Sequence, residues 1–346
     1  SEIWFTQRHE VGYFEGEQRK ETGMSQFFCI YSGELHDESE RSDEHIVPFS
    51  LGGSNQLVTR DVARIPNNEV GRTADSRLIN NFFMAHERWQ RGIASEDGHV
   101  PTVEFRGQVK IGDDWTRASF RINPDRTTEL VVPPKVESDW DEMSFKISCN
   151  PDDLPGIAAN IEKKGAKKGL TFQLLDHAQS TNEVTIPQPE MASGFSFDDD
   201  TMALGFVKMA LATGHHVLGY EWSQSEHADR LRGALRDNAD EVDWEQHAIH
   251  GSIWPDADAN LNQVLSAGPD RHVLFVSNNN PLAFYAFLFG KYNGLVQLAP
   301  GVWEGPGLPA GEGRVIVIDT GTREVFEFRF GEYIHHRTAK TLPFDV

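Results

Sequence analysis

Short, strongly apolar runs in the C-terminal part of the chain constrain its fold most, because such runs must be buried. Residues 273–276 (Val-Leu-Phe-Val) and 315–318 (Val-Ile-Val-Ile) have the length and the β-branched character of buried strands. Residues 201–220 are apolar along one side and predict a helix, and the acidic residues 198–200 suit its N-terminus. Residues 325–330 alternate between apolar and polar side chains and predict a last strand. We therefore expect an α+β fold.

The length of 346 residues suggests two or three domains, because one domain usually takes about 100–200 residues. Alternating apolar residues between 98 and 132 predict a β-rich region, and the prolines at 133–134 and 187–189 suit domain boundaries. We expect four segments, namely an N-terminal arm (1–24), a strand–loop–strand–helix module (25–95), a β-rich middle region (96–190) and an α/β C-terminal domain (191–346).

The chain is strongly acidic, with 53 Asp and Glu against 32 Lys and Arg and a formal net charge of −21. A protein that grips nucleic acid through its phosphates is normally basic on at least one face. The charge therefore argues against broad non-specific binding of nucleic acid, but not against a metal-dependent site, where carboxylates are needed. A solubility adaptation or a salt-rich habitat explains the acidity equally well.

Cys29 and Cys149 are the only cysteines, and they are far apart in the sequence. We therefore expect no disulfide framework. Two distant cysteines fit a protein of a reducing compartment. No run of about 18 apolar residues predicts a membrane span, and the first ten residues do not resemble a signal peptide. We expect a cytoplasmic protein with no membrane partner.

Three short motifs carry most of the functional information. They are Ser-Asp-Glu-His-Ile-Val-Pro at 42–48, Leu-Gly-Gly-Ser-Asn at 51–55 and Pro-Asn-Asn-Glu-Val-Gly at 66–71. Hydrolysis of a phosphodiester needs a base that deprotonates water and a cation that stabilises the charge developing on the phosphate. Histidine can act as a base near neutral pH, and a carboxylate and an amide carbonyl suit a hard divalent cation. The motifs supply each of these groups.

In these motifs the sequence resembles the HNH endonuclease family, in the branch that reads Glu-His-Ile-x-Pro, Leu-Gly-Gly and Asn-Asn-x-x-Gly. The resemblance covers about a fifth of the chain. It implies that His45 is the general base and that Asn55 braces the loop around it. It also implies that Asn67, with Glu44 or Asp43, holds one divalent metal ion, Mg²⁺ or Mn²⁺.

The family's core is a β-hairpin followed by a helix around the metal, so residues 25–95 are expected to form a ββα-metal module. Many members of this branch also hold a structural zinc between two Cys-x-x-Cys knuckles. Here Cys29 is followed by Ser32, and the positions of the second knuckle hold Ala63 and Pro66. One cysteine cannot close a tetrahedral zinc site, so we expect an active module without structural zinc.

If the module cleaves DNA, the contacts to DNA are expected on the arginines around the last motif. Six Arg and four acidic residues lie between positions 60 and 91, so this segment is locally basic. Guanidinium groups bind phosphate oxygens in a bidentate manner. Alternatively, these arginines pair with carboxylates on the helix surface. The candidates are Arg60, Arg64, Arg72 and Arg77.

Three other features are expected to be structural. His215 lies in the apolar helix and is expected to be a hydrogen-bonded core residue. The basic cluster at 163–168 is expected to be a solvated helix end, or else a contact to phosphate. His247 and His250 are expected on the surface rather than at a metal.

Taken as a whole, the sequence predicts a metal-dependent endonuclease that cleaves or nicks DNA. The C-terminal region is expected to sense a signal, recognise DNA, or bind a second copy of the chain or another protein. By analogy alone, this combination suggests restriction or phage defence. The alternative is a non-catalytic nucleic-acid-binding or assembly protein that retains a degenerate HNH scaffold. The acidic charge and the missing zinc knuckles favour the alternative, whereas the retained motif residues favour the enzyme.

Overall fold

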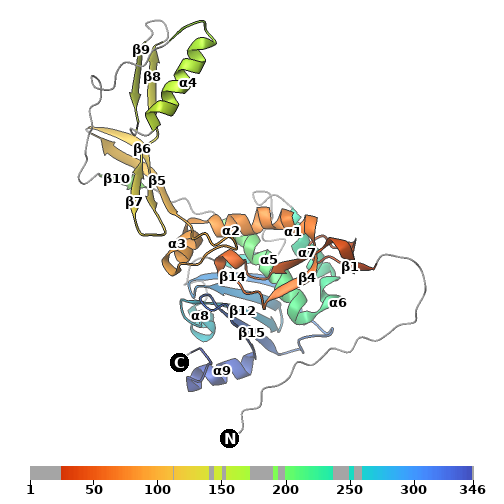
Figure 1. Cartoon of the computed structure of the whole chain (residues 1–346). Helices are drawn as coiled ribbons and strands as arrows, with labels where there is room; N and C mark the ends of the chain where they lie inside the picture. Colours follow the sequence, from red (N-terminus) through yellow and green to blue (C-terminus); the bar gives the residue numbers. More distant parts are fainter. Residues whose placement is uncertain are drawn as a thin grey trace.

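The computed structural model describes most of the chain from Ser25 onward (Figure 1). The predicted N-terminal arm, residues 1–24, lies outside the described residues, as do His247 and the side chain of His250. Helices and antiparallel sheets make up the described chain, so the predicted α+β fold is confirmed. The described ranges are 25–111, 113–139, 144–149, 153–171, 190–193, 199–236, 249–252 and 259–344.

A six-stranded antiparallel sheet forms the centre of the C-terminal part, with the strand order β11-β14-β13-β12-β15-β16. The two apolar runs predicted as buried strands lie side by side in it, and Phe275 is opposite Val315. On its other side Phe275 is opposite Tyr285. The strands are β11 (Ile249–Ser252), β12 (Arg271–Asn278), β13 (Leu282–Leu288), β14 (Tyr292–Ala299), β15 (Gly313–Asp319) and β16 (Val325–Arg329).

The two faces of this sheet bury alternate side chains, because successive residues of a strand point in opposite directions. In β12, Leu274 and Val276 belong to one hydrophobic core, and Val273 and Phe275 belong to a second. Helix α5 covers the first face, and α8 and α9 pack on the second (Figure 1). Burial on both faces explains why these strands are continuous apolar runs. The covering helices are α5 (Asp199–Leu218), α8 (Ala259–Leu265) and α9 (Phe330–Ala339).

The N-terminal segment packs against α5, which lies between the sheet and the helical elements η3 and α2. Gly205 of α5 approaches α2 so closely that a Cβ there would lie 2.6 Å from Cδ2 of Leu78. Leu78 and Met84 belong to the same hydrophobic core as Phe206 of α5. Residues 25–95 therefore share one continuous core with the C-terminal part.

The elements of the N-terminal segment are three short helical turns, three helices and four strands. They are β1 (Gln26–Phe28), β2 (Leu35–Asp37), the 3-10 turn η1 (Glu38–Glu40), β3 (Arg41–His45), the 3-10 turn η2 (Phe49–Leu51), β4 (Val58–Ala63), α1 (Arg64–Val70), the π-helical turn η3 (Gly71–Asp75), α2 (Ser76–Asn80) and α3 (Phe82–Arg91).

Two short helices, α6 (Tyr220–Ser223) and α7 (Glu226–Arg236), follow α5, and each contacts the N-terminal segment through a side chain. Buried Arg232 of α7 donates a hydrogen bond from Nη1 to the carbonyl oxygen of Ile30 at 3.1 Å. His215 of α5 is hydrogen-bonded as predicted, to Ser223 Oγ at 2.7 Å and to Asp61 Oδ2 at 2.9 Å.

The middle of the chain forms a second antiparallel sheet, with the order β10-β5-β6-β7. Helix α3 contacts its base, where the rings of Phe82 and Phe105 lie 5.0 Å apart and Trp89 Nε1 donates to Asn123 O at 2.8 Å. Figure 1 shows that this sheet extends away from the main body. Its strands are β5 (Val103–Ile111), β6 (Asp114–Ile122), β7 (Thr128–Val131) and β10 (Met191–Ser193).

Beyond this sheet lie the hairpin of β8 (Lys135–Asp139) and β9 (Ser144–Ser148) and helix α4 (Leu154–Ala166) (Figure 1). The basic cluster at 163–168 lies at the C-terminal end of α4, where its four lysines are exposed. This is the helix-end position that the sequence predicts. No helix in the described part of the chain is long and apolar enough to cross a membrane.

Strand β3 ends at His45, three residues before Pro48. Ile46 N still donates to Leu57 O at 3.2 Å, so the pairing with the second strand continues for one residue. Pro48 has no N–H for the ladder, and its carbonyl oxygen instead accepts from Leu51 N at 2.8 Å in the turn η2. His45 is therefore the last residue of its strand and lies at the start of a loop.

We expect Gly294→Ala to destabilise the chain, because a Cβ at this position in β14 would lie 2.2 Å from the ring of Phe206 in α5. Overpacking of this kind costs about 1–3 kcal/mol. The matched control is Gly301→Ala, because a Cβ there meets nothing within 4 Å. Urea unfolding should show a lower free energy of unfolding for Gly294→Ala alone. Equal stability of both variants would mean that α5 does not pack on the sheet as described.

Candidate functional site

His45 ends strand β3, and two neighbours from the following loop hold its imidazole ring. Nε2 lies 2.7 Å from Oδ1 of Asn55, and the ring of Phe49 packs at 5.3 Å between centroids. Because the amide oxygen of Asn55 accepts a hydrogen bond, the proton of the neutral ring lies on Nε2, and Nδ1 is the nitrogen that can accept one. His45 therefore has the tautomer that a base acting through Nδ1 requires.

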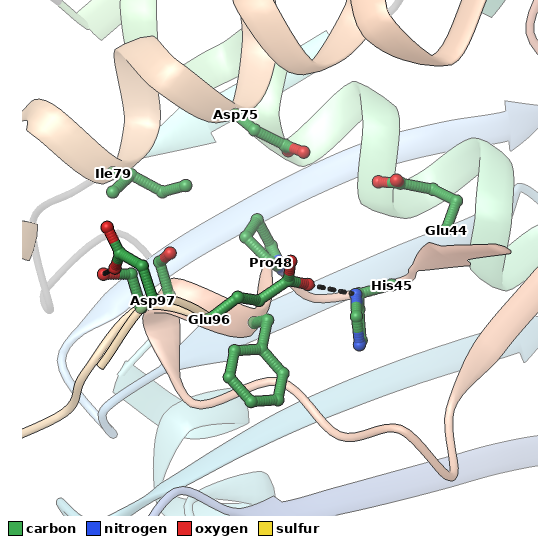
Figure 2. A pocket seen from close by; sticks show the side chains of 10 residues that line it. Glu44, His45, Pro48, Asp75, Ile79, Glu96 and Asp97 are labelled. Atoms are coloured by element: carbon green, nitrogen blue, oxygen red, sulfur yellow. Dashed lines mark hydrogen bonds and ion pairs between the residues drawn. The ribbon is translucent and has the colours of Figure 1, made fainter. Parts of the chain in front are cut away.

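A pocket of about 450 Å³ opens beside His45, and four of its ten lining residues are acidic (Figure 2). Nδ1 of His45 faces this pocket and lies 3.9 Å from Oε1 of exposed Glu96. Glu44 and Asp75 point toward the pocket from its other side (Figure 2). The lining residues are Glu44, His45, Pro48, Phe49, Ser50, Asp75, Ile79, Ser95, Glu96 and Asp97.

The acidic residues on the far side of the pocket are paired with a fully buried ammonium group from α5. Lys208 forms an ion pair with Glu44 and a second one with Asp75 Oδ2 at 3.1 Å. Its Nζ also donates to the backbone oxygen of His45 at 2.8 Å. One side chain of the C-terminal part therefore holds two pocket carboxylates and the backbone of the candidate base.

One carboxylate oxygen of Asp75, Oδ1, has no hydrogen-bond partner among the described residues. Burial raises the pKa of its carboxyl group above the usual value, because desolvation disfavours the charged form, and the attraction of Lys208 opposes the rise. Oδ1 of Asp75 and the hydroxyl of Tyr31 are buried and form no hydrogen bond with any described residue. Burial raises the pKa of Tyr31 well above its usual value, and the negative charges of Glu44 and Asp75 raise it further.

Hard divalent cations prefer oxygen ligands, and the carboxylates of Glu44 and Asp75 supply them at this pocket. The buried oxygen Oδ1 of Asp75, which has no hydrogen-bond donor among the described residues, fits such an ion. No group of three or more His, Cys, Asp or Glu side chains in the described chain could by itself hold a metal ion. The protein ligands at this pocket would therefore number two, with the other positions left to water or substrate.

The structure separates the other two predicted metal ligands from the pocket. Asn67, in α1, donates from Nδ2 to Ser42 Oγ at 3.3 Å and is not among the lining residues. Asp43 is exposed and pairs with Arg60 Nε at 3.1 Å. The structure therefore brings Asp75, and not Asn67 or Asp43, to the pocket beside Glu44.

The four predicted DNA-binding arginines lie along β4, α1, η3 and α2. Arg64 and Arg72 are exposed, Arg77 is partly exposed, and no ion pair joins these three to a described carboxylate. Arg60 is exposed and pairs with Asp43. Of the four arginines only Arg60 pairs with a described carboxylate, and it does so between strands β4 and β3, not on a helix surface.

Apolar packing fills the region of the missing zinc knuckles. Cys29 and Ala63 are fully buried, and the backbone N of Ala63 donates to Cys29 Sγ at 3.3 Å. The turn after Cys29 is closed by its carbonyl oxygen, which accepts from Gly33 N at 2.9 Å.

The loop after His45 is attached to the six-stranded sheet by the buried side chain of His272. Nε2 of His272 donates to Leu51 O at 2.7 Å, and Nδ1 accepts from Phe289 N at 3.2 Å. Burial lowers the pKa of His272 to about 4, and a proton on Nδ1 would face the N–H of Phe289. This contact requires the neutral imidazole.

Sequence reasoning missed Asp75 and Lys208. One signal for Lys208 is present, because it is the single charged residue within the apolar stretch 202–213. A buried lysine needs a carboxylate partner, so its position predicts an ion pair without naming the partner. Asp75 carries no such signal, because an acidic residue on a helix is normally solvated. Comparisons with protein-family models, curated proteins and solved structures found no match for this chain.

We expect Lys208→Met to lower the free energy of unfolding by about 3–5 kcal/mol, because it leaves the carboxylates of Glu44 and Asp75 partly buried without their cation. The control is Lys110→Met, which removes the exposed pair with Glu190 and should cost about 1 kcal/mol or less. Adding Glu44→Gln and Asp75→Asn to Lys208→Met should recover part of the loss. Similar denaturation curves for the two lysine variants would contradict the role of the buried pair.

We expect His272 to make stability depend on pH between about 4 and 6.5. Its pKa is lower in the folded state, so the unfolded chain binds the extra proton and the contribution is lost as pH falls below 6.5. From pH 7.5 to pH 5 the wild type should lose about 2 kcal/mol more than His272→Gln, whose amide can retain both hydrogen bonds. Urea unfolding at the two pH values measures this, with exposed His335→Gln as the control. Equal pH dependence in His272→Gln and wild type would show that His272 is not the titrating group.

Proposed function

We propose that this protein is a metal-dependent endonuclease of the HNH type that hydrolyses DNA phosphodiester bonds with His45 as the general base. The observation that carries the proposal is the environment of His45. Its Nε2 is bound to Asn55, while Nδ1 faces a pocket lined by carboxylates. A strand (β3), an antiparallel partner (β4) and a helix (α1) follow one another here, which is consistent with the proposal.

In the proposed reaction Nδ1 of His45 takes a proton from a water molecule in the pocket. The water oxygen forms a bond to phosphorus, the bond from phosphorus to the 3′ oxygen breaks, and the leaving 3′ oxygen takes a proton from solvent. Asn55 accepts a hydrogen bond from Nε2–H and so stabilises the imidazolium that forms. Asn55 therefore has both a positioning and an electrostatic role.

The proposed cofactor is one Mg²⁺ or Mn²⁺ ion, with Glu44 and Asp75 as its protein ligands. When bound, such an ion stabilises the charge that develops on the phosphate and on the leaving oxygen. The chain itself contributes the carboxylates, and Lys208 keeps them in place beside His45. The acidic lining otherwise repels a phosphate group, which supports a requirement for a cation.

The proposed substrate is DNA, and Arg64, Arg72 and Arg77 are its proposed contacts. Because no described carboxylate pairs with them, their guanidinium groups are free to bind phosphates. The net charge of −21 limits attachment elsewhere on the surface. A cytoplasmic location, a role in restriction or phage defence and a partner for the C-terminal region remain predictions from the sequence.

One observation favours the non-catalytic alternative. Lys208 already supplies a positive charge to Glu44 and Asp75, so this acidic pair is partly balanced without a divalent ion. Under this alternative the chain binds nucleic acid or assembles with a partner without cleaving a bond. Divalent ions and His45 would then have no effect on the integrity of the DNA.

We expect His45→Ala to lower the cleavage of plasmid DNA about 10²–10⁴-fold, because general bases contribute rate factors of this size. The fold should remain, because the imidazole lies at a pocket and not in the hydrophobic core. The assay measures nicked and linear plasmid with Mg²⁺ or Mn²⁺, with EDTA as one control and His335→Ala as the matched variant. Cleavage by His45→Ala at the wild-type rate would remove the assignment of the base. No cleavage by the wild type with either ion would favour the alternative.

A further inference from the structure

We infer that Arg323, in the C-terminal part of the chain, is a positioning residue that holds both neighbours of the His45 ring. This inference rests on the proposed role of His45 as the base. Arg323 lies in the turn between β15 and β16, more than 270 residues after His45 in the sequence. Part of the proposed catalytic machinery therefore lies in the C-terminal region.

The guanidinium group of Arg323 binds the loop that begins at Phe49. Its carbon Cζ lies 3.5 Å from the centroid of the Phe49 ring, and the same ring packs against His45. Nη1 donates to Phe49 O at 2.9 Å and to Gly53 O at 2.7 Å. One planar group thus fixes the ring of Phe49 and both ends of its loop.

The same guanidinium also binds next to a second segment of the pocket lining, residues 95–97. Nη2 of Arg323 donates to Ala94 O at 3.2 Å, and Ala94 comes just before Ser95, Glu96 and Asp97, which line the pocket. Partial burial lowers the pKa of Arg323, whereas the charge of Glu96 opposes this, and the guanidinium stays charged. Arg323 therefore joins the Phe49 loop to the segment that contains Ser95, Glu96 and Asp97.

The backbone around Arg323 holds the second neighbour of His45. Ser54 Oγ donates to Arg323 O at 2.5 Å, and Val325 N donates to Gln56 Oε1 at 3.3 Å. Asn55, which binds Nε2 of His45, lies between these two attached residues. Contacts with the β15–β16 turn thus support both groups that orient the imidazole.

The conformation of the turn agrees with a dedicated role for Arg323. Its φ of +61° lies in the left-handed region, which is unfavourable for a residue with a side chain. Asp319 stabilises this turn, because its Oδ1 accepts hydrogen bonds from Gly321 N and Thr322 N at 3.0 Å each. Residues held in such conformations often serve a function that the rest of the fold supports.

The test compares Arg323→Leu and Arg323→Lys with Arg337→Leu in the full chain. Arg337 is a matched control, because its guanidinium also donates to two backbone carbonyls, those of Ser266 and Gln263, but at α9 and not at the pocket. Nitrogen NMR of histidine-labelled protein reads the tautomer of His45, and His45→Gln assigns its signals. Plasmid cleavage gives kcat and KM for the same proteins.

We expect wild type and Arg337→Leu to show the single tautomer with the proton on Nε2. Arg323→Leu should populate both tautomers and lower kcat about 10- to 100-fold with little change in KM, because displacement of a catalytic group has effects of this size. Arg323→Lys should be intermediate, because an ammonium keeps the charge but lacks the planar fork. If Arg323→Leu does not fold, the Arg323→Lys variant still tests the inference.

An unchanged His45 tautomer in a folded Arg323 variant would overturn the inference, and so would an equal change in Arg337→Leu. The tautomer is measured without any cleavage, so this result is separate from the proposed function. If the wild type does not cleave DNA but Arg323→Leu changes the tautomer, the proposed function fails and the positioning of His45 by Arg323 is supported.

Discussion

The buried ammonium group of Lys208 is the interaction on which the relation between the two halves of the chain depends. It lies on α5, the helix that covers one face of the six-stranded sheet, and its partners Glu44 and Asp75 come from the N-terminal segment. A buried charge without its partner destabilises a protein by several kcal/mol. Separation of the two halves would therefore carry a large free-energy cost. The continuous hydrophobic core around α5 adds to this constraint. The pocket beside His45 therefore has a wall whose position is set by the C-terminal half.

The loop that follows His45 is attached to the sheet at two further places. His272 binds the carbonyl oxygen of Leu51 from within the sheet, and Arg323 binds the loop from the β15–β16 turn. These contacts place short loops on a rigid sheet, which is how catalytic groups are commonly positioned. The C-terminal half thus supports the candidate site.

The sequence predicted the fold class, the buried strands and the long apolar helix well, because each depends on a local pattern of apolar residues. For the site it identified His45 and Asn55, which the structure joins by a hydrogen bond, and Glu44, which lines the pocket. It did not identify Asp75, and the two other ligands that it named, Asn67 and Asp43, lie elsewhere. A motif defines the order of residues along the chain, whereas the direction of each side chain depends on the strand bulge and the helix packing around it.

By itself the sequence determined the buried strands at 273–276 and 315–318, the long apolar helix, and which histidine has an amide and a carboxylate close to it in the chain. These are local properties, set by side-chain alternation and by short separations along the backbone. The tertiary structure alone decided that Asp75 joins Glu44, that Lys208 lies between them and that Arg323 reaches Phe49. Those contacts join residues up to 274 positions apart, and they exist only because α5 packs between the sheet and the N-terminal segment. No local pattern contains that packing, since it arises from the burial of apolar surface by the whole chain.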